Sequence, residues 1–600
     1  MSAPLPSLAK IEADLARPRE ANAAPLNLVV LRNVTMESIV PYLRYLALQA
    51  GFDGRVALGD FGATIQEALA PRSAVLANEA DAVLVFTPLE TLSRKLTNDF
   101  ADLVSAEVEQ EVQRVIDECV AAIDGIRRQT RSMILWHGFE APTEPATGIR
   151  DVQSEPSQGD VVHRLNRALA AHLRKNANAF LVDVNACLMR VGADAFYDLR
   201  YRLMARAPYS AAALAVIASE DFKFVRAQKG RNKKCLVLDC DDTLWGGVVG
   251  EDGLAGIGLG DGYPGLAFVE FQREILNLNR RGILVALCSR NNEPDVWEVF
   301  DQHPHMLLRR ANIAAHRINW NNKVENLRQI AQELNIGLDS LVFADNSPFE
   351  IEMVQTALPQ VTTLLLPPSM PSQYRQFLAR CGLFETPYVT QEDTRRTDMY
   401  RAEADRRRAQ GSSLDLGEYL RSLQMRVDFG RADADTIPRI AQLTQKTNQF
   451  NLTTRRYSET DIKALVSDNR NDVLWMRVAD RFGDMGLVGV AVVTHTEGQA
   501  RIDTFLMSCR ILGRGIERAF LDEVVAAASS KGARELTGEF LATAKNAQVA
   551  GFYADNGFQM TRKEPAATYF RVATSQYQRR AEDHFAASRQ VGPAKLQEAS

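Results

Sequence analysis

The sequence lacks most of the features that mark secreted, zinc-binding or membrane-spanning proteins. Its seven cysteines are scattered and include no Cys-x-x-Cys pair, which argues against a disulfide framework or a cysteine zinc site. No two of its eight histidines have ligand spacing, and His303 and His305 flank Pro304 in an expected loop. No apolar run reaches the roughly 18 residues that span a bilayer, and no signal-peptide pattern opens the chain. We therefore expect a cytoplasmic protein without a membrane span.

An excess of charge of one sign is also missing. The formal net charge is −5, which gives no electrostatic basis for a nucleic-acid partner. Hydrophobic residues make up 46% and charged residues 24%, as in ordinary globular domains, and 600 residues are enough for three or four of them. We expect an α/β protein with a doubly wound N-terminal domain, a central parallel sheet and a C-terminal mixed α/β domain. The expected divisions are a mobile tail (1–25), an α/β domain (26–225), a central domain (230–388), a charged linker (389–424), a C-terminal domain (425–573) and a tail (574–600).

Alternating apolar runs and amphipathic stretches carry the N-terminal prediction. Residues 26–31, 81–86 and 132–136 have the pattern of buried strands, and 36–51 and 99–128 that of helices. This order favours a parallel sheet with helices on both faces. The charge run at 391–410 is typical of a helix whose charged side chains face solvent.

The central domain contains the strongest motif, 235-CLVLDCDDTLWGG-247. An apolar strand ends in Asp-x-Asp-x-Thr, so Asp239 and Asp241 emerge where ligands of parallel sheets bind. Two carboxylates this close repel unless a cation lies between them, and Mg²⁺ prefers such oxygen ligands. A carboxylate beside Mg²⁺ can attack phosphorus, and a second can act as acid and base. We assign these roles to Asp239 and Asp241.

Three further elements follow in order. A second apolar strand ends at Ser289, Lys323 opens a helix-like run, and a third strand ends at Asp345. We expect Thr243, Ser289 and Lys323 to bind phosphate, and Asp239, Asp241 and Asp345 to ligate the metal. This order of motifs, a strand with Asp, a strand with Ser, then Lys, then a strand with Asp, resembles that of the haloacid-dehalogenase-type (HAD) phosphohydrolases.

Two details modify this expectation. Many HAD proteins without a cap domain carry a second acid after the last Asp, whereas this chain has Asn346, with Glu350 nearby. The intervals between the motifs leave no room for a large cap, so the site should be open and suit a bulky or protein-borne substrate. The glycines of 246–265 are expected to serve turns beside it.

The segments DCDDTLWGGVVGEDG, LCSRNN, NWNNKVENL and FADNSPFE together resemble the FkbH-like branch of the HAD superfamily. The C-terminal part of the same branch is resembled by residues 443–459 and 505–517, and the N-terminal extension of its longer members by residues 31–53 and 206–210. The resemblance therefore spans about residues 26–572. It implies an enzyme that takes a glyceryl unit from 1,3-bisphosphoglycerate, removes its phosphate and loads it as a thioester on an acyl carrier protein. The residues themselves support phosphate removal and an open site, not the glyceryl unit or the carrier.

The C-terminal domain has a strand, a glycine loop and a helix over 508–532, followed by KNAQVAGFYADNGF at 545–558. Both resemble the GNAT acyltransferase fold, and backbone N–H groups at such a helix start can bind phosphate. The residues expected to bind the phosphopantetheine of a carrier protein, or coenzyme A, are Arg510, Gly513, Arg514, Gly515, Asn546 and Tyr553.

A thioester route also needs a thiol. Cys509 precedes the glycine loop and Cys240 lies beside Asp239, and both are kept as candidate catalytic residues. Strand alternation points Cys240 away from Asp239, and Cys288 has the same difficulty beside Ser289. A buried structural thiol is the competing interpretation for each.

The N-terminal domain resembles the SGNH hydrolases with their catalytic pattern lost. Arg32-Asn33 stands where that family has Gly-Asp-Ser, Thr87-Pro88 where an Asn is expected, and no His follows Asp198 by three residues. A scaffold or docking surface is therefore expected, with Asn33 and Arg32 as the residues to test for a divergent hydrolase.

Three functions remain in competition. The first is the glyceryl-loading enzyme. The second is a Mg²⁺-dependent phosphatase that acts on another phosphorylated small molecule and is fused to an acetyl-CoA-dependent acetyltransferase, in surface-polysaccharide or natural-product synthesis. The third is a non-catalytic scaffold for a carrier protein.

Overall fold

The computed structural model describes residues 5–17, 23–76, 80–176, 178–387, 392, 395–411, 416–508, 511–543, 545–579 and 584–589. The chain divides into two compact units, one of residues 3–231 and one of residues 232–600 with residues 1–2. Within the described ranges, no helix is both long and apolar enough to cross a membrane.

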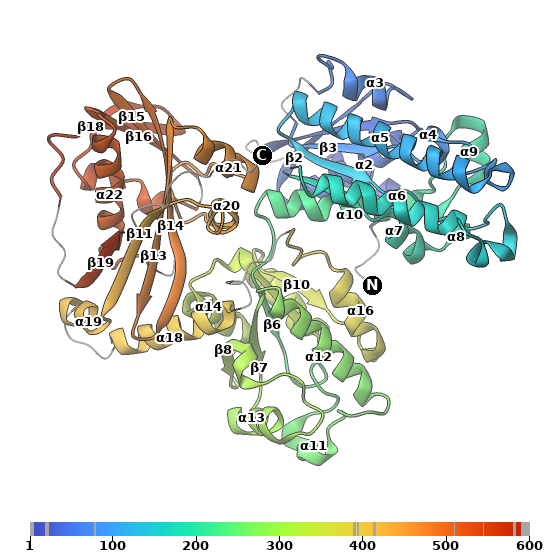
Figure 1. The fold of residues 1–600 in the computed structure, drawn as a ribbon. Coiled ribbons are helices and arrows are strands. Elements are labelled where there is room, and N and C mark those ends of the chain that lie inside the picture. Colours follow the sequence, from blue (N-terminus) through green and yellow to red (C-terminus); the bar gives the residue numbers. More distant parts are fainter. Residues whose placement is uncertain are drawn as a thin grey trace. The chain divides into compact units, whose positions relative to one another are not determined.

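The first unit contains a five-stranded parallel sheet in the order β2-β1-β3-β4-β5 (Figure 1). Its strands are β1 (Ala24–Arg32), β2 (Phe52–Leu58), β3 (Ala82–Phe86), β4 (Met133–His137) and β5 (Ala179–Val182). Apolar residues of alternating parity fill two separate cores, one on each face. The expected doubly wound domain is therefore confirmed.

Helices cover both faces of this sheet. One core takes residues from α1 (Leu8–Leu15), α2 (Val40–Gln49), α7 (Val184–Val191) and α10 (Ala211–Gln228), and the other from α3 (Thr64–Leu69), α5 (Ser105–Gln129) and α6 (Gln158–Leu173). The short helices α4 (Leu89–Leu92), α8 (Ala193–Phe196) and α9 (Leu199–Ala205) lie in connections. The expectation of a mobile tail over 1–25 is wrong for α1, because Ile11 is fully buried in the first core.

The second unit begins with another five-stranded parallel sheet, in the order β10-β9-β6-β7-β8. Its strands are β6 (Cys235–Leu238), β7 (Leu284–Ser289), β8 (Ile313–Ile318), β9 (Leu341–Asp345) and β10 (Thr362–Leu365). Its helices are α11 (Val249–Gly256), α12 (Gly265–Arg280), α13 (Glu293–Gln302), α14 (Lys323–Leu334), α15 (Pro348–Ala357) and α16 (Tyr374–Arg380). The central Rossmann-like parallel sheet expected from the sequence is thus confirmed.

The charged linker is helical, as predicted, over α18 (Arg396–Gly411) and α19 (Leu416–Ser422). The expectation that its charges face solvent is wrong for Glu403 and Arg406 of α18. Tyr400 packs into the core of the central sheet, and the side chains of Glu403 and Arg406 are buried. Buried ion pairs, described below, replace the solvent that these charges would otherwise require.

The C-terminal sheet is mixed and has nine strands, in the order β17-β18-β16-β15-β14-β13-β11-β19, with β12 paired to β15. They are β11 (Met425–Arg431), β12 (Phe450–Asn451), β13 (Asn471–Asp480), β14 (Gly483–Thr496), β15 (Gln499–Met507), β16 (Glu535–Leu541), β17 (Gln559–Lys563), β18 (Ala567–Ala573) and β19 (Phe585–Arg589). The helices are α20 (Ile437–Lys446), α21 (Glu459–Ser467), α22 (Ile516–Ser530) and α23 (Phe552–Asp555). The expected tail over 574–600 is wrong for β19, which adds a parallel edge strand to β11, while 590–600 lies outside the described residues.

Candidate active site

The four motifs of the central domain meet at the carboxyl-end edge of its sheet. Asp239 follows β6, Ser289 ends β7 and Asp345 ends β9, and these three strands are neighbours in the order β9-β6-β7. Lys323 is the first residue of α14, which follows β8. Buried strands with apolar side chains on both faces fix this arrangement, so the sequence-predicted set is brought together.

Lys323 lies between two carboxylates. Its Nζ is 3.0 Å from Asp239 Oδ1 and 2.7 Å from Asp345 Oδ2, and all three side chains are buried or nearly so. Burial alone would lower the pKa of Lys323, but the charges of Asp239 and Asp345 outweigh it and raise the pKa. Burial, together with the charge of Asp239, raises the pKa of Asp345 to about 6. Positive charge beside Asp239 and Asp345 therefore stabilises their ionised carboxylates.

Asp241 is held by three donors on the neighbouring loops. Trp245 Nε1 donates to its Oδ1 at 2.9 Å, the Val249 backbone N–H donates to the same oxygen at 3.1 Å, and Asn291 Nδ2 donates to Oδ2 at 2.7 Å. Burial nevertheless raises the pKa of Asp241 above its usual range. These contacts fix the carboxyl group in one orientation, as a positioned acid and base requires.

Sequence reasoning had missed Asn291 and Trp245. Asn291 stands two residues after Ser289, and its spacing alone does not reveal that it reaches Asp241 across 50 residues. Trp245 was visible only as part of the distinctive TLWGG segment. Both act on Asp241 rather than on phosphate.

The two predicted hydroxyl contacts differ. Ser289 is buried at the end of β7, and its side chain lies near the Cys240 thiol. Thr243 is fully buried, and its Oγ1 donates to Asn346 Oδ1 at 3.4 Å. The structure therefore makes Thr243 a support for Asn346, and the expectation that it binds phosphate directly is not met.

The metal prediction is corrected in one residue. Within the described part of the chain, no group of three or more His, Cys, Asp or Glu side chains could hold a metal ion. Asp241 does not join the other two acids as a ligand, because both of its carboxylate oxygens accept hydrogen bonds from Trp245, Val249 and Asn291.

Asp239 and Asp345 remain as carboxylate donors. Their oxygens converge on one cation, Lys323, and their mutual repulsion contributes to the raised pKa of Asp345. Hard carboxylate oxygens in need of further positive charge fit Mg²⁺, which uses one or two protein carboxylates and takes its other ligands from water and phosphate.

The cysteines near the site are structural. Cys240 and Cys288 are fully buried, and burial raises the pKa of the Cys240 thiol well above its usual range and that of Cys288 to about 12. A thiol without access or thiolate character is a poor nucleophile, so a catalytic role for Cys240 is not supported. Cys509 and Arg510 lie outside the described residues.

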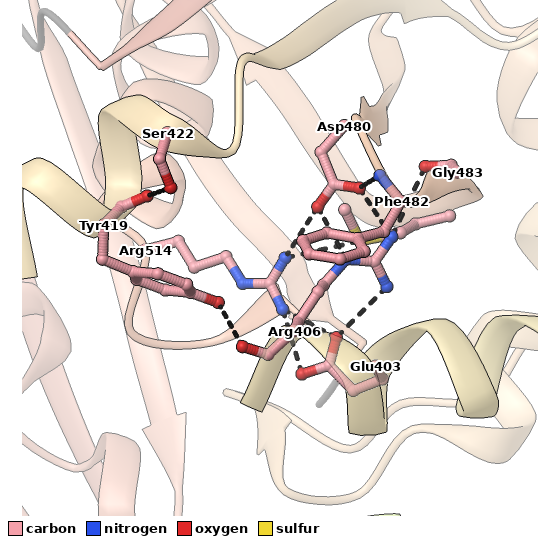
Figure 2. A network of polar contacts seen from close by, with 9 residues as sticks. Glu403, Arg406, Tyr419, Ser422, Asp480, Phe482, Gly483 and Arg514 are labelled. Atoms are coloured by element: carbon pink, nitrogen blue, oxygen red, sulfur yellow. Dashed lines mark hydrogen bonds and ion pairs between the residues drawn. The ribbon is translucent and has the colours of Figure 1, made fainter. Parts of the chain in front are cut away.

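Arg514, expected to bind pantetheine or coenzyme A, is instead part of a buried ion network (Figure 2). Its Nη2 donates to both carboxylate oxygens of Glu403, at 3.0 and 2.8 Å. Arg406 binds Asp480 through two hydrogen bonds of 2.6 and 2.7 Å. The guanidinium of Arg514 is buried and paired with α18, so this side chain is not available to a ligand. A contact of the Arg514 backbone with phosphate stays a prediction.

The backbone of the glycine loop is also engaged. The Gly513 N–H donates to the Glu517 side chain, so it is not open to a phosphate as the sequence predicted. Gly515 precedes α22 in the left-handed conformation (φ 77°), which explains the glycine by backbone geometry. The predicted helix is confirmed as α22, whereas the strand before it, β15, ends at Met507 and not within 508–532.

A segment of the chain fills the space between β15 and β16. These parallel strands pair from Gln499 to Ile502, and beyond that β12 pairs with β15. The Leu452 N–H donates to Phe505 O at 3.1 Å, and Leu452 O accepts from the Leu541 N–H at 2.8 Å. The backbone groups at the ends of β15 and β16 are therefore hydrogen-bonded to residues 450–452 of the same chain.

Asn546 and Tyr553 belong to the same packed region. Asn546 is fully buried, and its Nδ2 donates to Asn451 O and Leu541 O at 2.9 Å each, so it ties β12 to β16 instead of a ligand. Tyr553 is buried against Gly538, where a Cβ would lie 2.5 Å from the tyrosine ring. The expected helix over 545–558 is shorter, with a 3₁₀ turn at Ala547–Val549 and α23. The Asn546 amide is therefore committed to backbone partners, while the pantetheine contact predicted for Tyr553 stays a prediction.

The N-terminal unit has no hydrolase triad at the predicted positions. The Asp198 carboxylate accepts the Tyr201 N–H and caps α9. His137, at the end of β4, uses Nδ1 on Val85 O and Nε2 on Asp221 Oδ1, at 3.0 and 2.8 Å. Arg32 ends β1, Asn33 follows it, and Thr87 follows β3.

Exposed aromatic side chains surround the carboxyl-end edge of the central sheet. Tyr263 lies in the loop between α11 and α12, Trp320 in the loop after β8, and Phe349 in the first turn of α15. Their relative exposures are 74%, 70% and 67%. No cap domain is inserted between the motifs, in agreement with the predicted open site.

No protein-family model matches the chain, and neither does any curated protein. The chain is similar to the solved N-terminal part of protein BF1531 from Bacteroides fragilis, which contains a phosphatase domain and is complexed with Mg. The two are 27% identical, the alignment covers 64% of this chain and 100% of that one, and the TM-score is 0.59.

Solved acetyltransferases also align with about a quarter of the chain. A putative acetyltransferase of the GNAT family from Desulfovibrio desulfuricans is 18% identical over 25% of this chain and 99% of its own, with a TM-score of 0.21. The putative acetyltransferase YncA from Salmonella typhimurium, solved with acetyl-CoA, is 12% identical over 25% and 95%, with a TM-score of 0.20. At these scores neither likeness bears on activity, whereas the likeness to a Mg-containing phosphatase domain agrees with the Asp239–Lys323–Asp345 geometry.

Proposed function

We propose that the chain is a Mg²⁺-dependent phosphatase of the HAD type that acts on a large phosphorylated substrate. The contact of Lys323 with both Asp239 and Asp345 carries this proposal, because it places a nucleophile, a cation and a second acid at one edge. The 27% identical BF1531 fragment, which contains a phosphatase domain complexed with Mg, supports the same chemistry.

The residues can perform the reaction in two steps. The Asp239 carboxylate attacks phosphorus, the bond to the leaving oxygen breaks, and Asp241 donates its proton to that oxygen. Water then attacks the aspartyl-phosphate, Asp241 takes the proton from water, and Asp239 is released with inorganic phosphate. Lys323 and Ser289 bind the oxygens of the phosphoryl group. Mg²⁺ bound by Asp239 and Asp345 would neutralise charge on that group.

The open entrance supports a bulky substrate. A small metabolite is usually enclosed by a lid, whereas the aromatic rim of Tyr263, Trp320 and Phe349 offers apolar surface to a larger molecule. We retain a glyceryl unit bound for an acyl carrier protein as the narrower substrate hypothesis, because the FkbH-like segments imply it. The buried Cys240 gives the thioester step no support, and Cys509 is the thiol that stays to be tested.

Intact-mass and phosphate-release assays on the full chain test the proposal. With Mg²⁺ and a panel of phosphoesters, we expect phosphate release and a transient phosphoryl-sized mass gain on the protein. Asp239→Asn should abolish both, and Asp301→Asn, at an exposed acid of α13, should leave them unchanged. Equal activity of Asp239→Asn and the unmodified chain would refute the proposal.

The same assay separates the narrower substrates. In the presence of 1,3-bisphosphoglycerate and a phosphopantetheinylated carrier protein, a glyceryl-sized gain on the carrier would establish loading. A gain of an acetyl group on an acceptor with acetyl-CoA would favour the fused acetyltransferase. Phosphate release without either would leave the phosphatase as the activity.

A further inference from the structure

The N-terminal unit has a cluster of buried polar atoms without hydrogen-bond partners. Among the described residues, five such side-chain atoms come from four residues at one edge of its sheet. They are Arg32 Nε and Nη1, Asn33 Oδ1, Thr64 Oγ1 and Thr87 Oγ1. Buried polar atoms have hydrogen-bond partners almost everywhere in proteins, because an unsatisfied one destabilises the fold. Such a concentration indicates a place where a ligand supplies the missing bonds.

The fold brings these residues to neighbouring strand ends. Arg32 ends β1 opposite Phe86 of β3, and the Asn33 N–H donates to Phe86 O at 2.9 Å. Thr87 follows β3 directly, and Thr64 opens α3 after β2. The Gly62 N–H donates to Arg32 O at 3.0 Å, which holds the β2–α3 loop against β1. In this strand order the switch point lies between β1 and β3, where doubly wound sheets bind ligands.

Two arginines, of which one is buried, lie at this edge. Arg32 is only 8% exposed, and its Nη2 pairs with Glu37 at 2.9 Å while Nε and Nη1 have no partner. The guanidinium groups of Arg32 and Arg206 each lie 5.9 Å from the centre of the Phe61 ring. Two cations around one aromatic ring repel each other, and an anion would relieve that repulsion.

Hydrolysis does not fit this edge. No serine stands at the end of β1, and His137, the histidine at the end of β4, uses both ring nitrogens in other hydrogen bonds. His137 is therefore not available as a base for the hydroxyl groups of Thr64 and Thr87. The Arg32 donors, the two threonine hydroxyl groups and the Asn33 amide oxygen are therefore suited to binding a ligand and not to hydrolysing one.

We propose that this edge binds a small molecule that carries an oxyanion, a phosphate or a carboxylate, beside hydroxyl groups. Arg32 donates to the oxyanion, and Asn33 Oδ1 accepts a hydrogen bond from a hydroxyl of the ligand. Thr87 can donate or accept. The site belongs to residues 3–231 and is independent of the phosphatase proposed for the second unit.

Isothermal titration and thermal unfolding of the full chain, with chelator present, test the site. The probes are inorganic phosphate and L-malate, one for each source of the oxyanion. We expect at least one to bind and to raise the melting temperature. Arg32→Gln should weaken that binding roughly tenfold or more, because a charged hydrogen bond is lost. Arg55→Gln, at an exposed arginine of β2, is the matched control and should bind normally.

Thr87→Val separates binding from folding. Removal of a buried hydroxyl that has no partner should leave the chain without ligand equally or more stable, yet reduce the shift that the probe causes. A loss of stability in Thr87→Val without ligand would show a structural role and overturn the proposal. So would binding of neither probe. Phosphate binding that Arg32→Gln leaves intact and Ser289→Ala removes would belong to the phosphatase site and would also overturn it.

Discussion

Asn291 holds Asp241: its Nδ2 donates a 2.7 Å hydrogen bond to Asp241 Oδ2. If Asp241 protonates the leaving oxygen, Asn291→Ala should slow substrates with poor leaving groups most. We expect a loss of about 10-fold or more for alkyl phosphates and a smaller one for p-nitrophenyl phosphate, whose leaving group needs no proton. Steady-state rates with both substrates check this. Asn277→Ala, at an exposed residue of α12, is the control. Equal losses on both substrates would contradict the positioning role.

Lys323 neutralises two buried acids, and its removal should therefore affect folding as well as activity. Lys323→Met leaves Asp239 and Asp345 facing each other without their cation. We expect the free energy of unfolding to fall by about 3–5 kcal/mol in chelator, as for other broken buried pairs. Urea titration measures it, with Lys563→Met on the exposed strand β17 as the control. An unchanged urea midpoint would mean that the two acids are not charged together.

The network of Figure 2 predicts a large coupling energy between Glu403 and Arg514. Either single change, Glu403→Leu or Arg514→Met, leaves a buried charge short of a partner and should cost about 3–5 kcal/mol. The double variant should cost less than the sum of the two. By contrast, Arg310→Met breaks an ion pair that is about half exposed and should cost at most about 1 kcal/mol. Additive costs in urea unfolding would contradict the network.

Part of the candidate active site could be predicted from the sequence. Asp239, Ser289 and Asp345 could be predicted because each follows or ends an apolar strand, and the carboxyl ends of parallel strands meet at the same edge of a sheet. Asn291 could not, because its bond to Asp241 depends on how two loops meet. The burial of α18 was equally hidden, since Glu403 finds Arg514 111 residues further along the chain.

Local patterns predicted the wrong partners where atoms of the motif form contacts with distant parts of the chain or with neighbouring side chains. The glycine loop before α22 has the sequence of a phosphate loop, but Glu517 accepts the Gly513 N–H. The charges of 391–410 had the appearance of a solvated helix, yet Arg406 meets Asp480 in the interior. In both segments a motif gave the backbone shape correctly and the partner wrongly.

Asp472 should make stability depend on acid pH. Burial alone would raise its pKa, but the Lys531 hydrogen bond of 2.9 Å and the charges of Arg431 and Lys531 lower the pKa overall. A carboxylate with a lowered folded-state pKa stabilises the protein above its unfolded pKa of about 3.9 and loses that contribution as the pH falls through the folded value.

Asp472→Asn should therefore reduce the free energy of unfolding at neutral pH by about 1.5–3 kcal/mol, the range for hydrogen bonds to charged groups. The difference from the unmodified chain should shrink as the pH falls below about 4. Urea unfolding at several pH values measures it, with Glu564→Gln at an exposed acid as the control. A difference that stays constant with pH would rule out the ionised carboxylate as its source.

Trp320 should determine how well a large substrate is used. Its indole is 70% exposed beside the site, and its Nε1 donates to Asn292 Oδ1 at 3.1 Å, which holds the ring on the loop after Ser289. Burial of an aromatic face by a substrate contributes about 1.5–3 kcal/mol, so Trp320→Ala should lower kcat/KM for a phosphorylated carrier protein roughly 10-fold or more. Glycerol phosphate, too small to cover the ring, should be hydrolysed at the original rate.

Trp320→Phe separates the ring from its hydrogen bond. If the aromatic face contacts the substrate, Phe should restore most of the lost kcat/KM, whereas a role limited to holding Asn292 would leave it as slow as Ala. Ile149→Ala, the change of a 98% exposed residue in the other unit, controls for a general effect of surface apolar area. A parallel loss on glycerol phosphate would mean that Trp320 supports the catalytic loop itself, and the open rim would then have no part in substrate choice.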